Sequence, residues 1–451
     1  MKSNSIRWVA LLCAMLMCLG LCACGPAPDS SNPTVSNSGG TAQGLPTVNV
    51  TESKLKILCW SDLSGDVQKA NEVFGTNMVL EPTTVAWADM PTKLAQMVLG
   101  GTAPDVYYSR DVDFPLLAKK ELLEPLDDIF DFSGFLFEDC DYSQSRCAYN
   151  GKNYAAAARG SIGHVMWYNE KLFKEAGLET PRELYEQGKW DWDAYLNAAI
   201  EITDADQGIY GGAGMRALDW WLMTGKDVLT FDENGVPSSN LRDSDIVKAM
   251  DFWRELSVGK YNVYCPEGSP QELFKAGKIG MMIDGLWLAN STLTDMMKDN
   301  SANFAPMPKY PGADKHYQWG NYNALSIGKG AQNIEGAKAY IYYFLITSNA
   351  SLEYKESIPT VKALLEKNKQ TQIDNGWDDA DFAMNTEINT NIGKSFAPSE
   401  RVTGYTDYVE WVCCKPIRDT GVSWESQLAI HEEWLNDIML TYMEDVLGMK
   451  V

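Results

Sequence analysis

The side chains that most often carry enzymatic chemistry are few in this sequence or lack the spacing that catalysis requires. The 451 residues include three histidines, His164, His316 and His431, and no nucleophile elbow, phosphate-binding loop or zinc-protease helix. The cysteine spacing matches no zinc site, and the run Asp204–Gly208 lacks the glutamate that would complete a calcium loop. The sequence therefore favours binding over catalysis, with no cofactor and no metal. A catalytic pair of carboxylates among the 61 acidic residues stays open as an alternative.

Cys24 is the residue whose position indicates a covalent modification. A short cationic start leads into an apolar run at residues 8–21, which is too short to span a bilayer comfortably and is typical of a signal peptide. The segment Leu21–Gly25 resembles the bacterial lipobox, in which the cysteine thiol receives a diacylglycerol. Two or three acyl chains, at about 0.8 kcal/mol per buried methylene, give durable attachment. We therefore expect residues 1–23 to be a signal peptide and Cys24 to be lipidated, with an ordinary secretory signal as the alternative.

The composition limits the class of protein that follows the signal. Residues 24–50 are rich in Ser, Thr, Gly, Pro and Asn, which predicts a flexible linker after the lipidated cysteine. The remaining chain of about 400 residues is long enough for about two domains. A formal charge of -23 argues against nucleic acid and against an anionic membrane surface as ligands. Beyond the signal, Cys140 and Cys147 could close a small loop, although structural thiols are the favoured interpretation.

Strand-like and helix-like segments alternate from residue 54 onward. Residues 54–60, 78–82 and 105–108 are expected to be strands, and residues 66–74 and 92–99 are expected to be helices. This alternation predicts a parallel sheet with helices on its faces, and ligands of such folds bind at the carboxyl ends of the strands. The first places to look for ligand contacts are therefore Trp60, Ser61 and Asp62 after the first strand, and Tyr108, Ser109, Arg110 and Asp111 after the third.

An ordered series of short motifs resembles the extracellular solute-binding proteins of sugar ABC importers. The first stretch, Lys93–Leu126, contains Gly101-Thr102-Ala103-Pro104-Asp105-Val106. The series continues in the family's order through Tyr149–Tyr154, Trp167–Phe173, Ala176–Leu178 with Pro181, Trp190–Asp193, Phe274–Met282 and Leu325–Lys329, followed by a helix at Ile334–Thr347. Each piece is weak alone, but the order over some 300 residues is specific. The likeness fades from about Glu366 onward.

The resemblance implies an α/β fold of the periplasmic-binding-protein-like type, with two α/β lobes joined by crossing hinge strands and type II-like topology. The first crossing is expected at Ala155–Gly160, the second at Met281–Gly285, and a third near Thr347. Lobe 1 would then combine residues 51–155 with 287–347, and lobe 2 would combine residues 156–286 with 348–451. Ligand binding would close the two lobes by hinge motion.

The resemblance also implies which residues contact a sugar. A pyranose offers apolar C–H faces and a rim of hydroxyls, so its site needs flat aromatic rings and planar polar side chains. The expected aromatic contacts are Trp60, Trp87, Trp220, Trp287, Trp319 and Tyr322, although each tryptophan could instead be a core residue and only one of the adjacent Trp220 and Trp221 can readily face a ligand. The expected polar contacts are Asp111, Arg159, Asp284 and Asn321. The alternatives are helix capping by Asp111, an ion pair of Arg159 across the lobes and turn capping by Asp284.

The function implied by the resemblance is that of a receptor, not of an enzyme. We expect a monomer, lipid-anchored at the outer face of the cytoplasmic membrane, that binds a carbohydrate, most plausibly an oligosaccharide, and delivers it to the transmembrane permease of an ABC importer. Ser109 stands where maltose-binding members often carry an aromatic residue, which argues against a maltodextrin ligand. The alternatives are a peptide or other non-sugar solute on the same scaffold, a secreted glycosidase and a surface adhesin.

Overall fold

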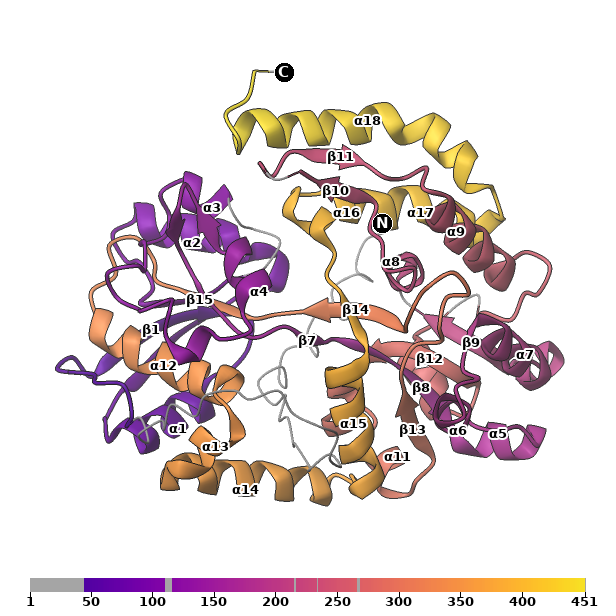
Figure 1. The fold of residues 1–451 in the computed structure, drawn as a ribbon, viewed down its shortest axis with the longest axis horizontal. Helices are drawn as coiled ribbons and strands as arrows, with labels where there is room; N and C mark the ends of the chain where they lie inside the picture. Colours follow the sequence, from indigo (N-terminus) through magenta and orange to yellow (C-terminus); the bar gives the residue numbers. More distant parts are fainter. Residues whose placement is uncertain (1–43, 110–115, 215, 233, 266–267, 451) are drawn as a thin grey trace, which may run out of the picture. The chain divides into compact units, whose positions relative to one another are not determined.

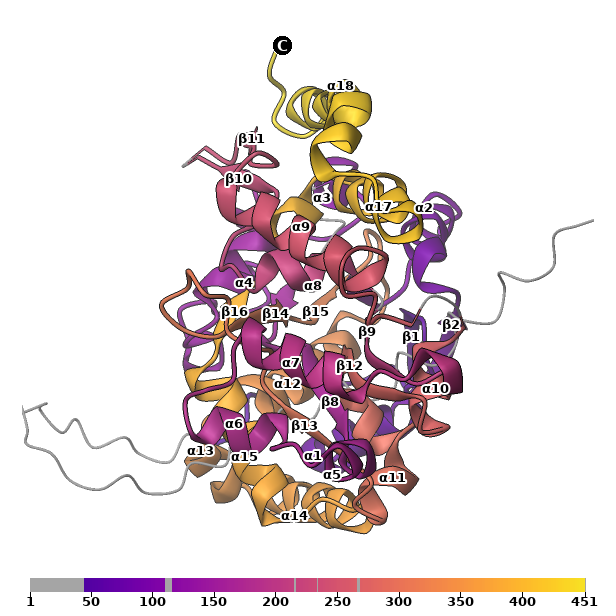
Figure 2. The same ribbon diagram turned by 90° about the vertical axis from the view of Figure 1, so that its right-hand side faces the viewer.

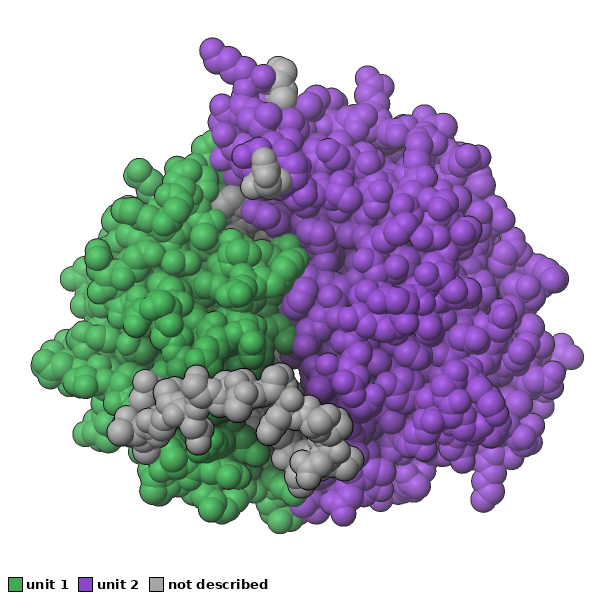
Figure 3. Space-filling view, viewed as in Figure 1, with its two compact units in different colours: residues 1–160, 322–371 green, residues 161–321, 372–451 purple. Residues whose placement is uncertain are grey.

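The chain folds into two compact units, which are coloured separately in Figure 3. The computed structural model describes residues 44–109, 116–214, 216–232, 234–265 and 268–450. Unit 1 takes residues 1–160 and 322–371, and unit 2 takes residues 161–321 and 372–451. Each unit is therefore assembled from two separate stretches of sequence.

Unit 1 is built on a five-stranded sheet in the order β2-β1-β3-β15-β6. Strands β1 and β15 of this sheet are labelled in Figure 1. Its first three strands, β1 (Lys54–Cys59), β2 (Val79–Thr84) and β3 (Val106–Ser109), are parallel. They alternate along the chain with α1 (Ser64–Phe74) and α2 (Met90–Leu99), which confirms the predicted alternation. Strand β15 (Ala324–Ser326) pairs antiparallel with β3 on one side and with β6 (Ala156–Ala157) on the other.

The other elements that begin in unit 1 are short, apart from two helices of its second stretch. They are α3 (Leu116–Lys119), α4 (Asp141–Arg146), β4 (Ala148–Tyr149), β5 (Lys152–Asn153), α12 (Ile334–Asn349), α13 (Leu352–Ser357) and α14 (Pro359–Asp374). Helix α12 contacts α1, β1 and β6, so the second stretch of the unit packs against the first.

Unit 2 holds a four-stranded sheet in the order β13-β8-β12-β9 and a three-stranded sheet in the order β16-β14-β7. The central strands β8 (His164–Asn169) and β12 (Ile279–Gly285) are buried at every position, which follows from their nearly continuous apolar runs. The remaining strands are β7 (Ser161–Ile162), β9 (Tyr210–Gly214), β13 (Ala302–Ala305), β14 (Tyr317–Asn321), β16 (Gly393–Ser395) and the hairpin β10 (Leu229–Phe231) and β11 (Pro237–Ser239).

Helices cover the four-stranded sheet of unit 2, with α5 and α7 packed together and α7 against β9 and β12 (Figure 2). The helices of this unit are α5 (Glu170–Ala176), α6 (Pro181–Glu186), α7 (Trp192–Ile202), α8 (Ala217–Leu222), α9 (Ser244–Ser257), α10 (Pro270–Lys275), α11 (Thr294–Lys298), α15 (Asp379–Asn391), α16 (Tyr405–Tyr408), α17 (Cys414–Thr420) and α18 (Trp424–Asp445). Val165, Trp167, Met282 and Phe304 lie in one buried core cluster of the unit.

The division of the chain differs from the expected one at the second and third crossings. The first division follows Gly160, at the end of the expected crossing Ala155–Gly160. The expected second crossing, Met281–Gly285, is instead part of the interior strand β12, which pairs with β8 on one side and with β9 on the other. The chain returns to unit 1 only after Asn321, and it leaves again after Thr371. A short apolar run does not distinguish a central strand from a crossing strand, which explains the difference.

Two further expectations concern membrane spans and thiols. In the described part of the chain, every helix is too short or too polar to cross a bilayer. The described cysteines Cys59, Cys140, Cys147, Cys265, Cys413 and Cys414 form no disulfide with one another. Structural thiols were the favoured interpretation, and burial raises the pKa of the Cys140 thiol to about 11.

Candidate ligand-binding residues of the two units

Three aromatic rings of unit 2 lie together at the start of strand β8. The imidazole of His164 lies 4.6 Å from the ring centroid of Trp319 and 5.8 Å from that of Trp287. Strand pairing brings them together, because His164 pairs with Gly285 at the end of β12 and Trp287 follows two residues later. The Nε1 atoms of both indoles are buried and have no hydrogen-bond partner among the described residues. The structure thus gathers two predicted site residues, Trp287 and Trp319, around a histidine.

Charged side chains flank this aromatic group. His164 Nδ1 lies 2.8 Å from Asp219 Oδ1, and both residues are buried. The guanidinium of Arg216 lies 5.6 Å from the ring centroid of Trp319, in the geometry of a cation–π contact. Arg216 also forms ion pairs with Glu410 at 2.9 Å and with Glu400 at 3.6 Å. Burial alone would lower the pKa of Arg216, but the attraction of the two carboxylates raises it, so the guanidinium stays charged.

Asp284 lies inside strand β12 and does not cap a turn. One carboxylate oxygen accepts a hydrogen bond from Gln271 Nε2 at 2.9 Å, and the other accepts one from the backbone N–H of Gly285 at 2.7 Å. Burial raises the pKa of this carboxyl group above its usual value. Both oxygens are engaged within unit 2, so a direct contact between Asp284 and a ligand stays a prediction.

The other two predicted residues of unit 2 are buried. Asn321 ends strand β14, and its Oδ1 atom accepts a hydrogen bond from Ser161 Oγ at 3.4 Å. Trp220 is 0% exposed; its indole N–H donates to Tyr264 Oη at 3.0 Å, and its ring packs among those of Trp192 and Phe252. The expectation that Trp220 is a ligand platform is therefore wrong in this conformation, because a fully enclosed indole presents no face to a ligand. Helix α8 is buried at all six positions, and this places the whole Trp220-Trp221 pair in the core.

A second aromatic group lies in unit 1, at the carboxyl ends of β1 and β3 as predicted. Trp60 follows β1 and makes edge-to-face contacts with Trp87 at 4.3 Å and with Tyr108 at 5.4 Å. Trp87 is 40% exposed and Trp60 is partly exposed, so both rings can be reached from outside the unit. Tyr108 was expected to follow the third strand; it lies inside β3, and its ring completes the group.

The remaining predicted contacts of unit 1 have partners within that unit. Arg159 donates to the backbone carbonyls of Asn349 at 2.9 Å and Glu138 at 3.3 Å, and it lies 3.6 Å from the Asp139 carboxylate. All of these partners belong to unit 1, so they differ from the alternative of an ion pair across the lobes, and a contact between Arg159 and a ligand stays a prediction. Tyr322 is buried, and its hydroxyl accepts a hydrogen bond from Arg146 Nε at 3.2 Å. Asp111 and Cys24 lie outside the described residues.

The residues that sequence reasoning missed are His164, Arg216 and Asp219. His164 lies beside both indoles of unit 2, Arg216 lies over Trp319, and Asp219 contacts His164. All three stand far apart in sequence from Trp287 and Trp319. Two of them could have been found from their positions at strand ends, since His164 begins β8 and Arg216 follows β9. Each unit therefore offers aromatic faces beside polar groups, an arrangement suited to noncovalent binding of a polar molecule.

Comparisons with known proteins extend this description. The sequence matches the family of the bacterial extracellular solute-binding protein over residues 64–347. The diacetylchitobiose binding protein DasA of Streptomyces coelicolor is 24% identical over 335 residues, which cover 70% of this chain and 73% of that protein. An ABC substrate-binding protein of Listeria monocytogenes, in complex with cycloalternan, has a TM-score of 0.63 at 20% identity, covering 86% of this chain and 98% of that chain. The GacH receptor of Streptomyces glaucescens, described unliganded and with acarbose, has a TM-score of 0.61 at 17% identity, covering 88% of this chain and 99% of that chain.

The similarity to these solved structures shows the fold, and it confirms the predicted α/β class of the periplasmic-binding-protein-like type. The family match takes in residues of both units and more than half of the sequence. The chain therefore belongs to the bacterial extracellular solute-binding protein family.

Proposed function

We propose that this protein binds a carbohydrate outside the cell and delivers it to the permease of an ABC importer. The observation that carries the proposal is the group of His164, Trp287 and Trp319 in unit 2. Flat aromatic rings match the apolar C–H faces of a sugar, and the charged groups beside them match its hydroxyls. The two buried indole N–H groups lack an acceptor among the described residues, and buried polar groups of this kind normally have a partner.

The names of the relatives support the same class of ligand. The relatives include a diacetylchitobiose binding protein, and the solved neighbours hold cycloalternan, acarbose or mannotriose. These ligands differ in linkage and shape, so they support a saccharide without selecting one. The aromatic group of Trp60, Trp87 and Tyr108 gives unit 1 faces of the same kind.

The proposed cycle is one of capture and release without chemical change of the ligand. Ligand binding shifts an equilibrium between open and closed arrangements of the two units, and the permease recognises the closed one. The protein acts as a monomer, held at the outer face of the cytoplasmic membrane by a lipid on Cys24. In a host with an outer membrane, this location is the periplasm.

A thermal-shift screen of the full-length chain in detergent tests the proposal. The panel contains chito-, manno-, malto- and xylo-oligosaccharides, with a set of short peptides as the non-sugar arm. A true ligand raises Tm with its concentration, because it binds the folded state and not the unfolded one. Chromatography of the incubated saccharide then distinguishes a receptor, which returns it intact, from a glycosidase, which shortens it. If no saccharide shifts Tm while peptides do, the proposed ligand class is wrong.

Membrane attachment needs its own test. Mass spectrometry of the mature N-terminus should find a diacylglycerol adduct on Cys24, and a Cys24→Ala variant should appear in the soluble fraction of the culture. A mature chain that starts at another residue and carries no lipid would contradict the anchor.

A further inference from the structure

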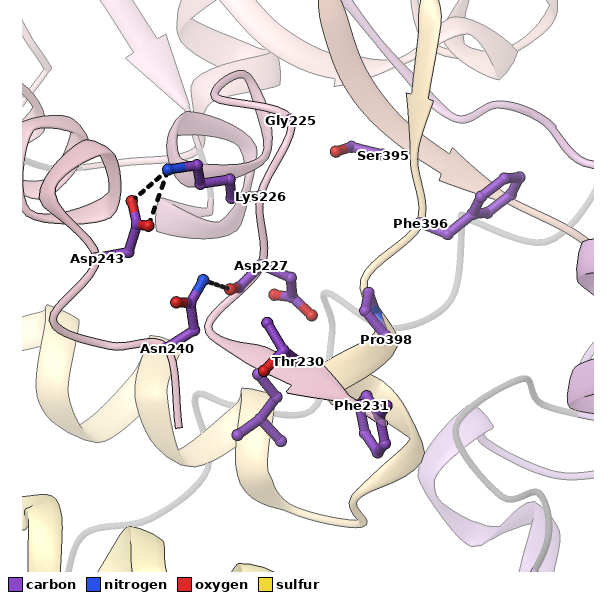
Figure 4. A pocket seen from close by; sticks show the side chains of 11 residues that line it. Gly225, Lys226, Asp227, Thr230, Phe231, Asn240, Asp243, Ser395, Phe396 and Pro398 are labelled. Atoms are coloured by element: carbon purple, nitrogen blue, oxygen red, sulfur yellow. Dashed lines mark hydrogen bonds and ion pairs between the residues drawn. The ribbon is translucent and has the colours of Figure 1, made fainter. Parts of the chain in front are cut away.

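Unit 2 contains a polar pocket whose lining does not include His164, Trp287 or Trp319. The pocket lies beside the hairpin β10–β11 and has a volume of about 510 Å³ (Figure 4). This volume falls within the range of roughly 300–1,000 Å³ that is typical of small-molecule sites. Its walls come from the loop before β10, from β10 itself, from the loop after β11, and from the end of β16 with the segment that follows it. All of its lining residues belong to unit 2.

The charges around the pocket disfavour an anion. Lys226 is the cationic residue of the lining, and its ammonium group lies 2.8 Å from carboxylate oxygens of both Asp243 and Asp245. Hydrogen bonds from Lys226 and Tyr310 lower the pKa of Asp245 to about 2, so this carboxyl group is ionised. The three N–H groups of Lys226 are thus engaged by two negative charges, so this lysine offers little positive potential to a phosphate, a sulfate or a uronic acid.

The polar groups that stay open to a ligand are mostly acceptors or hydroxyls. Asn240 donates its amide N–H to the backbone carbonyl of Asp227, which leaves Asn240 Oδ1 as an acceptor. The Ser395 hydroxyl forms no side-chain hydrogen bond with any described residue, and Figure 4 shows it on the pocket side of its strand. The Thr230 hydroxyl makes a 3.5 Å bond to Ser238 O, at the limit of a hydrogen bond. Such a lining suits a neutral ligand with many hydroxyl donors.

An aromatic side chain contributes an apolar wall. Phe231, at the end of β10, lines the pocket, and the guanidinium of Arg401 lies 5.3 Å from its ring centroid. A ring that is held in place by a cation presents a fixed flat surface, which is the second requirement of a pyranose site. Hydroxyl partners and an aromatic wall thus occur together in one pocket.

Two connections within unit 2 link a residue of the pocket lining to the aromatic group. Ser395 on β16 pairs in parallel register with Trp319 on β14, and neighbouring strands lie about 4.8 Å apart. In addition, the turn Pro398–Arg401 begins with a residue of the pocket wall and carries Glu400, which is ion-paired with the Arg216 that covers Trp319. A ligand on Trp319 therefore lies one strand away from Ser395.

From this placement we infer that the pocket is an outer subsite, which holds a further sugar unit of a neutral oligosaccharide whose inner unit contacts Trp319. The inference rests on the proposed function and deepens it: the preferred ligand is a chain of several uncharged sugar units, and its far end interacts with Thr230, Asn240, Ser395 and Phe231.

Calorimetric titration of the full-length chain in detergent tests the outer subsite. The probes are chito-oligosaccharides and maltodextrins, each from the disaccharide to the hexasaccharide. Thr230→Trp fills the pocket from an exposed hairpin position, and Ser395→Ala removes one hydroxyl without adding volume. The matched control is Thr441→Trp, at an exposed threonine of α18 outside the pocket.

The expected result is a loss that depends on chain length. Thr230→Trp should weaken binding of the longest bound saccharide about tenfold or more, because it displaces a whole sugar unit, and should leave the disaccharide within about twofold. Ser395→Ala should show the same trend with a smaller loss, and Thr441→Trp should match the wild type.

Three results would overturn the inference. Equal affinities of the Thr230→Trp variant and the wild type at every chain length would show that the pocket is empty when ligand is bound. An equal loss for the disaccharide and the hexasaccharide would show that the pocket is not an outer subsite. In both cases saccharide binding by the wild type leaves the proposed function intact, whereas a wild type that binds neither series would remove the proposed function together with the subsite.

Discussion

Gly163 lies directly against the indole of Trp319: a Cβ atom added to this glycine would come within 2.4 Å of Trp319 Cε3 and Cζ3. Gly285 has the same relation to Trp287, where an added Cβ would lie only 2.0 Å from Cε2. Neither glycine has a positive φ, so it is space and not backbone conformation that requires glycine here. The two indoles of unit 2 are thus each positioned against bare backbone.

Replacing Gly163 with alanine should therefore disturb the ring that the proposed ligand contacts. The added methyl group cannot coexist with Trp319 in its present position, so the indole must move or the strand must shift. We expect saccharide affinity to fall by about 1–3 kcal/mol, measured by calorimetry with the best ligand of the thermal-shift panel. Gly65→Ala is the control, because a Cβ on Gly65 meets nothing within 4 Å. Equal affinity of Gly163→Ala and the wild type would show that the position of Trp319 is irrelevant to binding.

Trp287 and Trp220 should respond to truncation in opposite ways. Trp287→Ala should weaken saccharide binding by about 1–3 kcal/mol and leave a folded protein, since the ring is partly exposed. Trp220→Ala should cost about 3–5 kcal/mol of unfolding free energy, because its ring is fully enclosed among other aromatic side chains. Urea unfolding and calorimetry of both variants separate the two roles. A Trp287→Ala variant with unchanged affinity would exclude this residue from the binding site.

Removing the charge of Arg216 should destabilise unit 2 through its partners. Arg216→Met would remove the charged partner of the buried Glu410 carboxylate. That carboxylate would then keep the backbone N–H of Leu218 as a hydrogen-bond donor. We expect a loss of about 3–5 kcal/mol in the free energy of unfolding, which is the usual cost of breaking a buried ion pair from one side. Adding Glu410→Gln to the same chain should recover part of this loss, because the neutral amide can still accept from Leu218. Additive effects of the two substitutions in a double-mutant cycle would rule out this coupling.

Asp284→Asn should change how stability depends on pH. Burial raises the pKa of Asp284, so the folded state retains this proton at pH values where the unfolded state has lost it. The proton bound by Asp284 therefore stabilises the folded wild type at low pH, and this contribution to the free energy of unfolding is lost as pH rises from the ordinary aspartate pKa through the raised one. The asparagine does not titrate, and the Gln271 amide can turn to accept its N–H. The stability difference, variant minus wild type, should increase with pH across this window and then level off, as measured by urea unfolding between acidic and neutral pH. A difference that is flat or decreases with pH would contradict the prediction.

The fold was predictable where hydrophobic periodicity is unambiguous. Strands β1, β2 and β3 and helices α1 and α2 lie within two residues of their expected bounds at every end, because strand-like and helix-like patterns alternate there and turn residues separate them. Strand β12 was also evident as an apolar run, but its pairing partners were not, so it was misplaced as a crossing segment. Pairing between strands that are distant in sequence is decided by tertiary packing, which single-sequence patterns do not contain.

The candidate site was predictable only as single residues. Trp60, Trp87 and Trp287 were expected from the family resemblance, and Trp319 was expected in a loop before a strand, although it lies inside β14. The structure brings these four residues into two aromatic groups. His164 and Asp219 could not be assigned, because their contact joins residues from β8 and α8. Trp220 shows the opposite error: its aromatic character suggested recognition, while the burial of α8 on all sides makes it a core residue.

The sheet of unit 1 also constrains the order in which the chain can fold. Strand β6 has β15 as its neighbour in that sheet, and β15 follows the whole first stretch of unit 2, residues 161–321. During synthesis or export, β3 and β6 therefore appear long before β15, the strand that pairs with both. Until β15 is available, the backbone N–H and C=O groups along the facing edges of β3 and β6 lack hydrogen-bond partners. Pairing strands that are separated by so long a stretch of sequence is slow, because a long loop must be closed first. A chain truncated before residue 324 would expose an aggregation-prone edge, so a chaperone that keeps the polypeptide unfolded until it is complete would favour its maturation.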